Sequence, residues 1–93
     1  MSFTKETAAE AARTDLAGRL GLGWGEVKVV SVDDTEFPDM SLGAPASGEI
    51  AATMMTSGWK IKLQAQERNF EYRADKYQLR LHNFKGKNYV IAS

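Results

Sequence analysis

Residues 59–81 read Trp-Lys-Ile-Lys-Leu-Gln-Ala-Gln-Glu-Arg-Asn-Phe-Glu-Tyr-Arg-Ala-Asp-Lys-Tyr-Gln-Leu-Arg-Leu, and apolar and polar side chains alternate along most of this stretch. A period of two is typical of strands that bury one face and expose the other. The pattern therefore predicts three antiparallel strands, which cover residues 59–66, 69–75 and 77–82.

Two tight turns would join these strands, one at Glu67-Arg68 and the other at Asp75-Lys76. The first turn pairs Ala65 with Phe70 and Leu63 with Tyr72. The second pairs Ala74 with Tyr77, Tyr72 with Leu79 and Phe70 with Leu81, and it sets Glu71 opposite Arg80. Both registers keep the apolar residues on one face, as a half-buried antiparallel sheet requires.

The first third of the chain predicts a helix and one more strand. Thr4 is a suitable N-cap for a helix over residues 4–20, which Gly21 can end. Residues 27–32 are rich in valine and predict a strand, with Val30 and Val32 on one face and Val27 and Val29 on the other. The pattern also allows short strands over 50–55 and 89–92. We therefore expect a single α+β domain over residues 1–93, with the N-terminal helix packed on an antiparallel sheet of about four strands.

Composition restricts the classes of function. The chain has 93 residues, no cysteine and a net charge of zero, divided into −5 over residues 1–57 and +5 over residues 58–93. The lack of cysteine excludes disulfides and thiolate chemistry. No apolar run is long enough to span a membrane, and residues 1–10 lack the features of a signal peptide. We therefore expect a soluble protein that is either cytoplasmic or a mature domain whose targeting segment has been removed.

Residues 33–57 contain both prolines and several glycines, and they predict a long irregular segment. Long loops in small domains often carry function. The most promising binding surface is the loop 37–48, with the candidate residues Phe37, Asp39, Met40, Ser41 and Leu42.

A sequence resemblance covers residues 11–81 and rests on five stretches. They are Ala12-Arg-Thr-Asp-Leu-Ala-Gly-Arg-Leu-Gly21, Val29-Val-Ser-Val, Phe37-Pro-Asp-Met-Ser-Leu-Gly-Ala-Pro45, Gly58-Trp-Lys-Ile-Lys-Leu-Gln-Ala and Phe70-Glu-Tyr-Arg-Ala-Asp75. This order of features resembles a group of small uncharacterised bacterial domains, often found in secreted proteins or lipoproteins, with an aromatic-Pro-Asp-x-Ser-Leu-Gly-Cys-Pro loop. The resemblance implies a fold and no activity. Ala44 stands where exported relatives tend to have cysteine, which favours a reducing compartment for this chain.

The sequence supports a metal site, a catalytic site or a nucleic-acid site less well than it supports a binding loop. The acids at 33, 34, 36 and 39 lack the spacing of a calcium loop, so we expect no metal and no cofactor. Asp39, Ser41 and His82 could form a hydrolase triad, but no Gly-x-Ser-x-Gly motif surrounds the serine. The strand aromatics fall on the apolar face and the net charge is zero, which disfavours nucleic acid as a partner.

The sequence thus favours a non-catalytic protein-binding or regulatory module that uses the loop 37–48. Two alternatives stay open. One is a homo-oligomeric structural domain that self-associates through the sheet, and the other is a small enzyme with a site near Asp39, Ser41 and His82.

Overall fold

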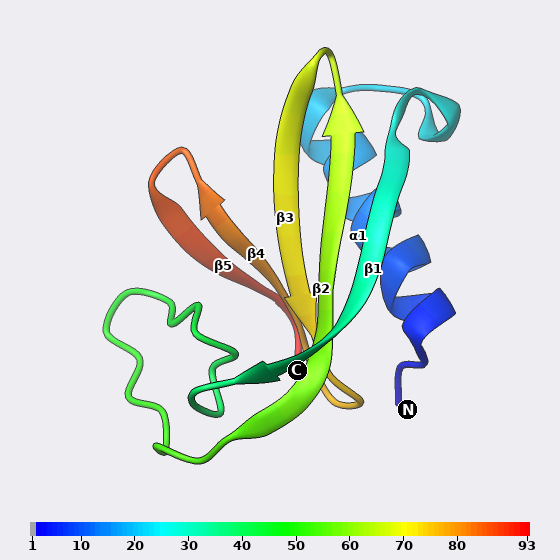
Figure 1. The fold of residues 1–93 in the computed structure, drawn as a ribbon. Helices are drawn as coiled ribbons and strands as arrows, with labels where there is room; N and C mark the ends of the chain where they lie inside the picture. Colours follow the sequence, from blue (N-terminus) through cyan, green and yellow to red (C-terminus); the bar gives the residue numbers. More distant parts are fainter. Residues whose placement is uncertain (1) are drawn as a thin grey trace.

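The computed structural model describes residues 2–93 as one helix packed on a five-stranded antiparallel sheet (Figure 1). The elements in chain order are α1 (Lys5–Leu20), a short 3-10 helix η1 (Trp24–Glu26), β1 (Lys28–Phe37), β2 (Thr56–Ala65), β3 (Arg68–Ala74), β4 (Leu79–Phe84) and β5 (Lys87–Ala92). The strands pair in sequence order, so the sheet is a meander. The α+β expectation is confirmed, with five strands where the sequence predicted about four.

Helix α1 begins and ends as its sequence predicts. The Thr4 side chain accepts a hydrogen bond from the Thr7 amide, and Thr7 Oγ1 accepts one from the Thr4 amide, which satisfies two N–H groups that have no partner within the helix. Gly21 adopts the left-handed conformation at the C-terminal end, with φ of 67°. The buried face of the helix is mostly alanine, which allows its backbone to approach the sheet closely.

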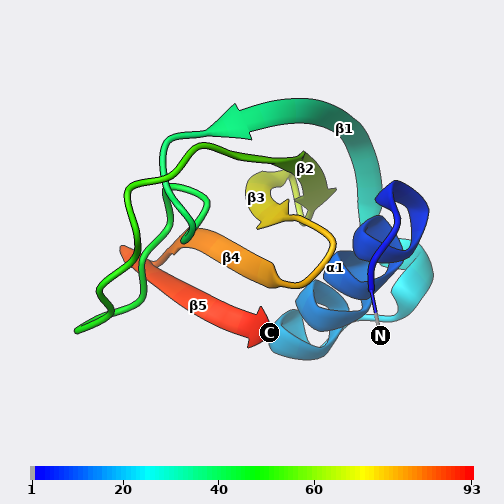
Figure 2. The ribbon, with the colours of Figure 1, turned by 90° about the horizontal axis from the view of Figure 1, so that it is seen from below.

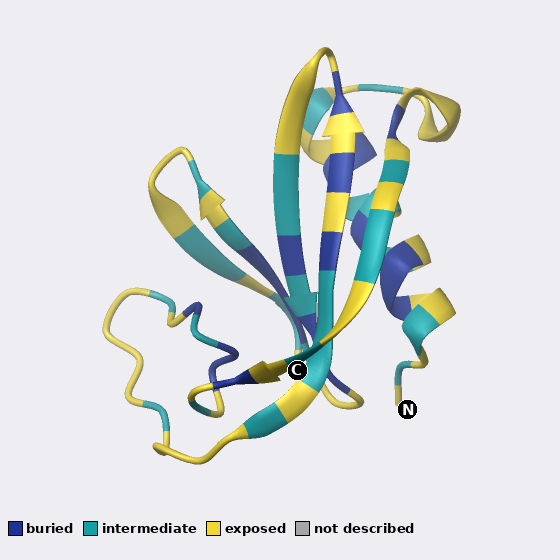
Figure 3. Cartoon of the chain, in the orientation of Figure 1, coloured by how far each residue is buried: buried dark blue, intermediate teal, exposed yellow. Residues whose placement is uncertain are grey.

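The core lies between α1 and one face of the sheet, here called the inner face (Figures 2 and 3). Its largest fully buried side chains come from the helix, the segment after η1 and the three middle strands: Leu16, Val27, Ile61, Leu63, Tyr72, Leu79 and Leu81. The opposite face, here called the outer face, carries the polar side chains of the same strands. Residues 38–55, which connect β1 to β2, lie at the side away from the helix (Figure 2).

The predicted register between β2 and β3 is wrong by two residues. Gln66 and Glu67 form the turn, with φ of 53° and 62°, and the observed pairs are Ala65 with Arg68, Leu63 with Phe70 and Ile61 with Tyr72. A shift of two preserves which face each side chain occupies, so the alternation alone could not detect it. Two-residue hairpins need left-handed turn residues, usually Asn or Gly, and Gln-Glu gives no such signal.

The predicted register between β3 and β4 is also wrong by two residues, because the connecting turn spans 75–78. Asp75 Oδ1 accepts hydrogen bonds from the amides of Tyr77 and Gln78, so its carboxylate closes a longer turn than the two-residue one predicted. Tyr72 therefore lies opposite Leu81 and Ala74 opposite Leu79. The predicted pair of Glu71 with Arg80 is replaced by two others, Glu71 with His82 and Arg73 with Arg80.

Strand β1 is longer than predicted and its side-chain alternation is interrupted. The register with β2 shifts between Val29 and Ser31, so Val30 occupies a β-bulge and is 53% exposed. Val29 and Val32 both pack against the core, which corrects the predicted grouping of Val30 with Val32.

The ends of other strands also differ from the sequence prediction. Strands β1 and β2 extend into the segment that was predicted to be irregular, which leaves residues 38–55 between them. Residues 50–55 form no strand, whereas the strand predicted at 89–92 is present as β5.

Gly58 lies where the backbones of neighbouring strands approach too closely for a side chain. A Cβ there would overlap the Ala74 carbonyl oxygen and contact the Phe37 ring. We expect Gly58→Ala to lower the free energy of unfolding by about 1–3 kcal/mol. Gly18→Ala is the matched control, since Gly18 is inside α1 with open space around it, and this change should raise stability by about 0.5–1 kcal/mol. Urea unfolding measures both, and equal effects of the two substitutions would contradict this packing.

Candidate functional site

Three basic side chains form a row across the outer face of the sheet. Lys60 on β2 lies opposite Arg73 on β3, which lies opposite Arg80 on β4. Like charges on directly opposed residues destabilise a sheet unless other groups neutralise them. Glu71 accepts a hydrogen bond from Arg73 Nε at 2.8 Å, but this pairing leaves the two guanidinium groups with most of their donors free for other partners.

The β1–β2 connection supplies those partners. Arg73 Nη1 donates to the carbonyl oxygens of Leu42 and Gly43, at 3.0 and 3.1 Å. Arg80 Nη1 donates to the Ala44 carbonyl at 3.1 Å, and the same guanidinium forms a two-point ion pair with Glu49, with Nη2 and Oε2 2.8 Å apart. These contacts bind the loop to the outer face.

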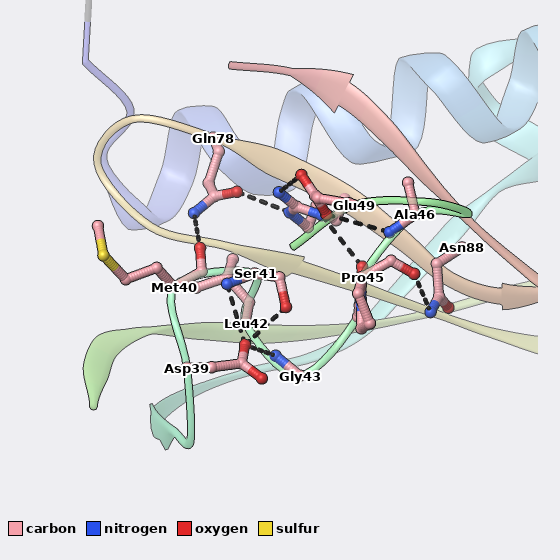
Figure 4. Close-up of polar contacts among 12 residues, drawn as sticks. Asp39, Met40, Ser41, Leu42, Gly43, Pro45, Ala46, Glu49, Gln78 and Asn88 are labelled. Atoms are coloured by element: carbon pink, nitrogen blue, oxygen red, sulfur yellow. Dashed lines mark hydrogen bonds and ion pairs between the residues drawn. The ribbon is translucent and has the colours of Figure 1, made fainter. Parts of the chain in front are cut away.

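Two amide side chains, one in the β3–β4 turn and one on β5, make further contacts with the loop (Figure 4). Gln78 Nε2 donates to the Met40 carbonyl and Asn88 Nδ2 donates to the Pro45 carbonyl. Five consecutive or nearly consecutive loop carbonyls, those of residues 40, 42, 43, 44 and 45, therefore accept hydrogen bonds from sheet side chains. A loop can lie against a sheet only if its backbone polar groups are satisfied in this way.

Asp39 fixes the shape of the loop from within. Its Oδ1 accepts hydrogen bonds from the Ser41 amide, the Ser41 hydroxyl and the Gly43 amide, at 2.9, 2.6 and 3.0 Å. The Ser41 hydroxyl and the Gly43 amide lower the pKa of Asp39, because both stabilise the carboxylate. Asp39 thus acts as the hydrogen-bond centre of a tight turn.

Glu49 is the second acid that holds the loop. The Arg80 guanidinium, with a smaller contribution from the Ala46 amide, lowers the pKa of Glu49 from 4.5 to about 2. Arg80 is a buried residue and Glu49 retains 31% of its side-chain exposure. The ion pair therefore lies at the boundary between the covered outer face and solvent.

The five candidate residues have different surroundings. The side chains of Phe37, Ser41 and Leu42 are buried, and a partner could touch them only if the loop moved away from the sheet. Asp39 is partly buried, and Met40 is exposed. The structure thus brings the five residues together, and Met40 is the one whose side chain is freely available.

Exposed apolar side chains outside the predicted loop 37–48 follow in the second half of the β1–β2 connection. Ile50 is 97% exposed, and Met54 and Met55 are 60% and 68% exposed. The Met40 amide donates to the Ala52 carbonyl at 3.0 Å, so Met40 lies beside this segment. The sequence carries a signal for them, an apolar run between Gly48 and Gly58, but this run also fits the short strand predicted over 50–55.

Ser41 and His82 do not form the geometry of a hydrolase. The buried Ser41 hydroxyl donates to Asp39, whereas His82 pairs with Glu71 on β3 and lines a separate cavity. Within residues 2–93, no group of three or more His, Asp or Glu side chains is arranged to hold a metal ion. No helix in the described part of the chain is long and apolar enough to cross a membrane.

The fold and this loop define a small α+β domain in which a helix covers one face of a meander and a polar-anchored loop covers part of the other. A family model described as a domain of unknown function (DUF8738) matches residues 9–82, which is more than half of the chain, so the chain belongs to this family. The searches of curated proteins and of solved structures return no match.

Acid should weaken the loop contact through Glu49. Because its pKa is lowered on folding, this carboxylate stabilises the fold fully above pH 4.5, and the contribution is lost as the pH falls towards about 2. We expect Glu49→Gln to lower the free energy of unfolding by about 1–2 kcal/mol at pH 7, because solvent partly screens the pair. The difference between wild type and variant should shrink between pH 4.5 and 2, as measured by urea unfolding. A difference that does not change over this range would show that the ion pair is not formed.

Proposed function

We propose that the chain is a non-catalytic protein-binding module whose contact surface is the apolar loop patch, defined as Met40, Ile50, Met54 and Met55. The observation that carries the proposal is the exposure of these side chains on a connection that hydrogen bonds and an ion pair bind to the sheet between residues 40 and 49. Contiguous exposed apolar residues on a small domain commonly mark a site of protein interaction.

Hydrogen bonds hold the backbone beside the patch, which favours binding. Gln78 and the Ala52 carbonyl hold the Met40 backbone, and Asp39 and Glu49 hold the turns on either side. A surface that is ordered before association loses less conformational entropy when a partner binds. The side chains themselves are three methionines and one isoleucine. Methionine adapts its shape readily to an apolar groove.

The buried part of the candidate set has a supporting role in this proposal. Phe37, Ser41 and Leu42 pack beneath the loop and Asp39 orders it, so their effect on binding is indirect. Changes at these positions should disturb the position of the patch and the stability of the fold together.

We further propose that the family includes exported bacterial relatives in which a cysteine in this loop takes part in a disulfide, and that this chain works in a reducing compartment. In this chain Ala44 is fully buried and its carbonyl accepts a hydrogen bond from Arg80. Side-chain hydrogen bonds and the Glu49 ion pair would then do here what a covalent link does in those relatives.

Comparative capture tests the binding proposal. Wild-type protein, the patch variant Ile50→Ser/Met54→Ser/Met55→Ser and the control Tyr77→Ser/Val90→Ser are each immobilised and exposed to extract from the source organism. The control removes two exposed apolar side chains outside the loop. We expect one partner to be retained by wild type and control and lost by the patch variant. With that partner purified, calorimetry should show binding weakened about tenfold or more.

Two outcomes would contradict the proposal. One is that all three proteins retain the same set of partners. The other is a wild-type oligomer, detected by light scattering, that the patch variant converts to monomer, since this would identify the patch as a contact between copies of the chain.

A further inference from the structure

The outer face has a second feature, which lies beyond the area that the loop covers. Pairing between β3 and β4 ends at Glu71 and His82, and beyond this point the β2–β3 and β4–β5 hairpins diverge (Figure 1). An open cavity of about 610 Å³ lies there, here called the notch. Its lining residues are Val30, Lys62, Asn69, Phe70, Glu71, His82 and Asn83.

The notch forms where the backbone of β4 is irregular. Asn83 adopts a left-handed conformation with φ of 52°, and its amide donates to Asn88 Oδ1 at 2.8 Å. The β4–β5 register shifts between Leu81 and Phe84, as expected for a bulge, which bends and twists a strand. Bulges often lie next to functional sites, where they redirect side chains.

The charges that line the notch leave one positive group free. Glu71 is bound to Arg73 Nε at 2.8 Å, so its charge is largely compensated. Lys62 lies opposite Glu71 on β2, but its side chain forms no ion pair and no hydrogen bond with any residue in 2–93. The Lys62 ammonium is therefore available to an anion.

Neutral polar groups and apolar surface accompany this charge. The side-chain amides of Asn69 and Asn83 are exposed and bind no other described residue. His82 Nδ1 is buried without a hydrogen-bond partner, and burial, followed by the Arg73 charge, lowers the pKa of His82, so the imidazole is neutral at pH 7. Val30, which the β1 bulge turns outward, and Phe70 supply the apolar part of the lining.

We infer that the notch binds a small organic monocarboxylate with an apolar group, in which the carboxylate pairs with Lys62 and accepts from the asparagine amides while the apolar group lies against Val30 and Phe70. A monoanion matches the single lining cation that has no ion-pair partner, whereas a phosphate dianion would need more positive groups. The cavity volume is within the range of about 300–1,000 Å³ that is common for small-molecule sites.

This site is independent of the proposed protein-binding patch. The patch belongs to residues 40–55, and none of those residues lines the notch. The patch variant should therefore bind the carboxylate as well as the wild type does, so the two proposals can fail separately.

Phenylacetate is a suitable probe, and its binding can be followed by amide chemical shifts in NMR titrations. We expect shifts centred on Lys62, Asn69, Phe70 and Asn83. Lys62→Met should weaken binding about tenfold or more, the loss expected for one charge-assisted contact. Lys76→Met is the matched control. Lys76 is exposed in the turn at the other end of β3, and its substitution removes the same charge. It should bind like wild type.

Three comparisons can overturn the inference. Phenylacetamide has the same ring without the charge, and equal binding of acid and amide would show that the charge is not recognised. Tighter binding of inorganic phosphate would replace the monocarboxylate with a different anion. Much tighter binding of a short peptide with a free C-terminal phenylalanine would identify a protein terminus as the natural occupant. Equal loss in both lysine variants, or no shifts at millimolar phenylacetate, would also contradict the site.

Discussion

The arrangement of this domain depends on two arginines that face each other on the outer side of the sheet. Arg73 and Arg80 lie directly opposite on β3 and β4, with Lys60 next in the same row. Such a row would be unfavourable in a bare sheet. It is stabilised because loop carbonyls and the carboxylates of Glu49 and Glu71 surround the guanidinium groups. The row of charges and the loop therefore require each other.

This constraint divides the outer face into two regions with different properties. Where the arginines lie, the loop covers the sheet and presents methionines and an isoleucine to solvent on its far side. Beyond Glu71 and His82 the sheet is uncovered, and divergence of the two hairpins opens the notch. On the inner face, the Tyr72 hydroxyl donates to Asp15 on α1 at 2.7 Å, so polar contacts on both faces fix the middle strands. Side chains of one strand, β3, thus contact the helix on one face and the loop on the other.

The fold class and the orientation of most strand residues could be predicted from alternation and helix capping, because both are local. The registers could not, since a two-residue shift leaves every side chain on the same face and the deciding turns at Gln66-Glu67 and Asp75 gave no usual hairpin signal. The loop proposed to bind a partner can be predicted from its prolines and its length. Which of its residues are exposed was not predictable, because Phe37 and Leu42 contact residues far away in the sequence, such as Arg73, whose guanidinium lies over the Phe37 ring and donates to the Leu42 carbonyl. Arg73 and Arg80 look like ordinary solvated residues in sequence.

Hydrogen exchange at the loop amides tests the central claim that the loop is part of the folded unit. The amides of Ser41 and Gly43 bind Asp39, and that of Ala44 binds the Ser41 carbonyl, while the carbonyls around them bind the sheet. If the arginines hold the loop on the sheet, these amides should exchange slowly, in wild type close to the rate of β3 amides, and Arg80→Met should speed their exchange selectively. Fast exchange of the loop amides in the wild type, with β3 protected, would show that the loop opens freely and would contradict this account.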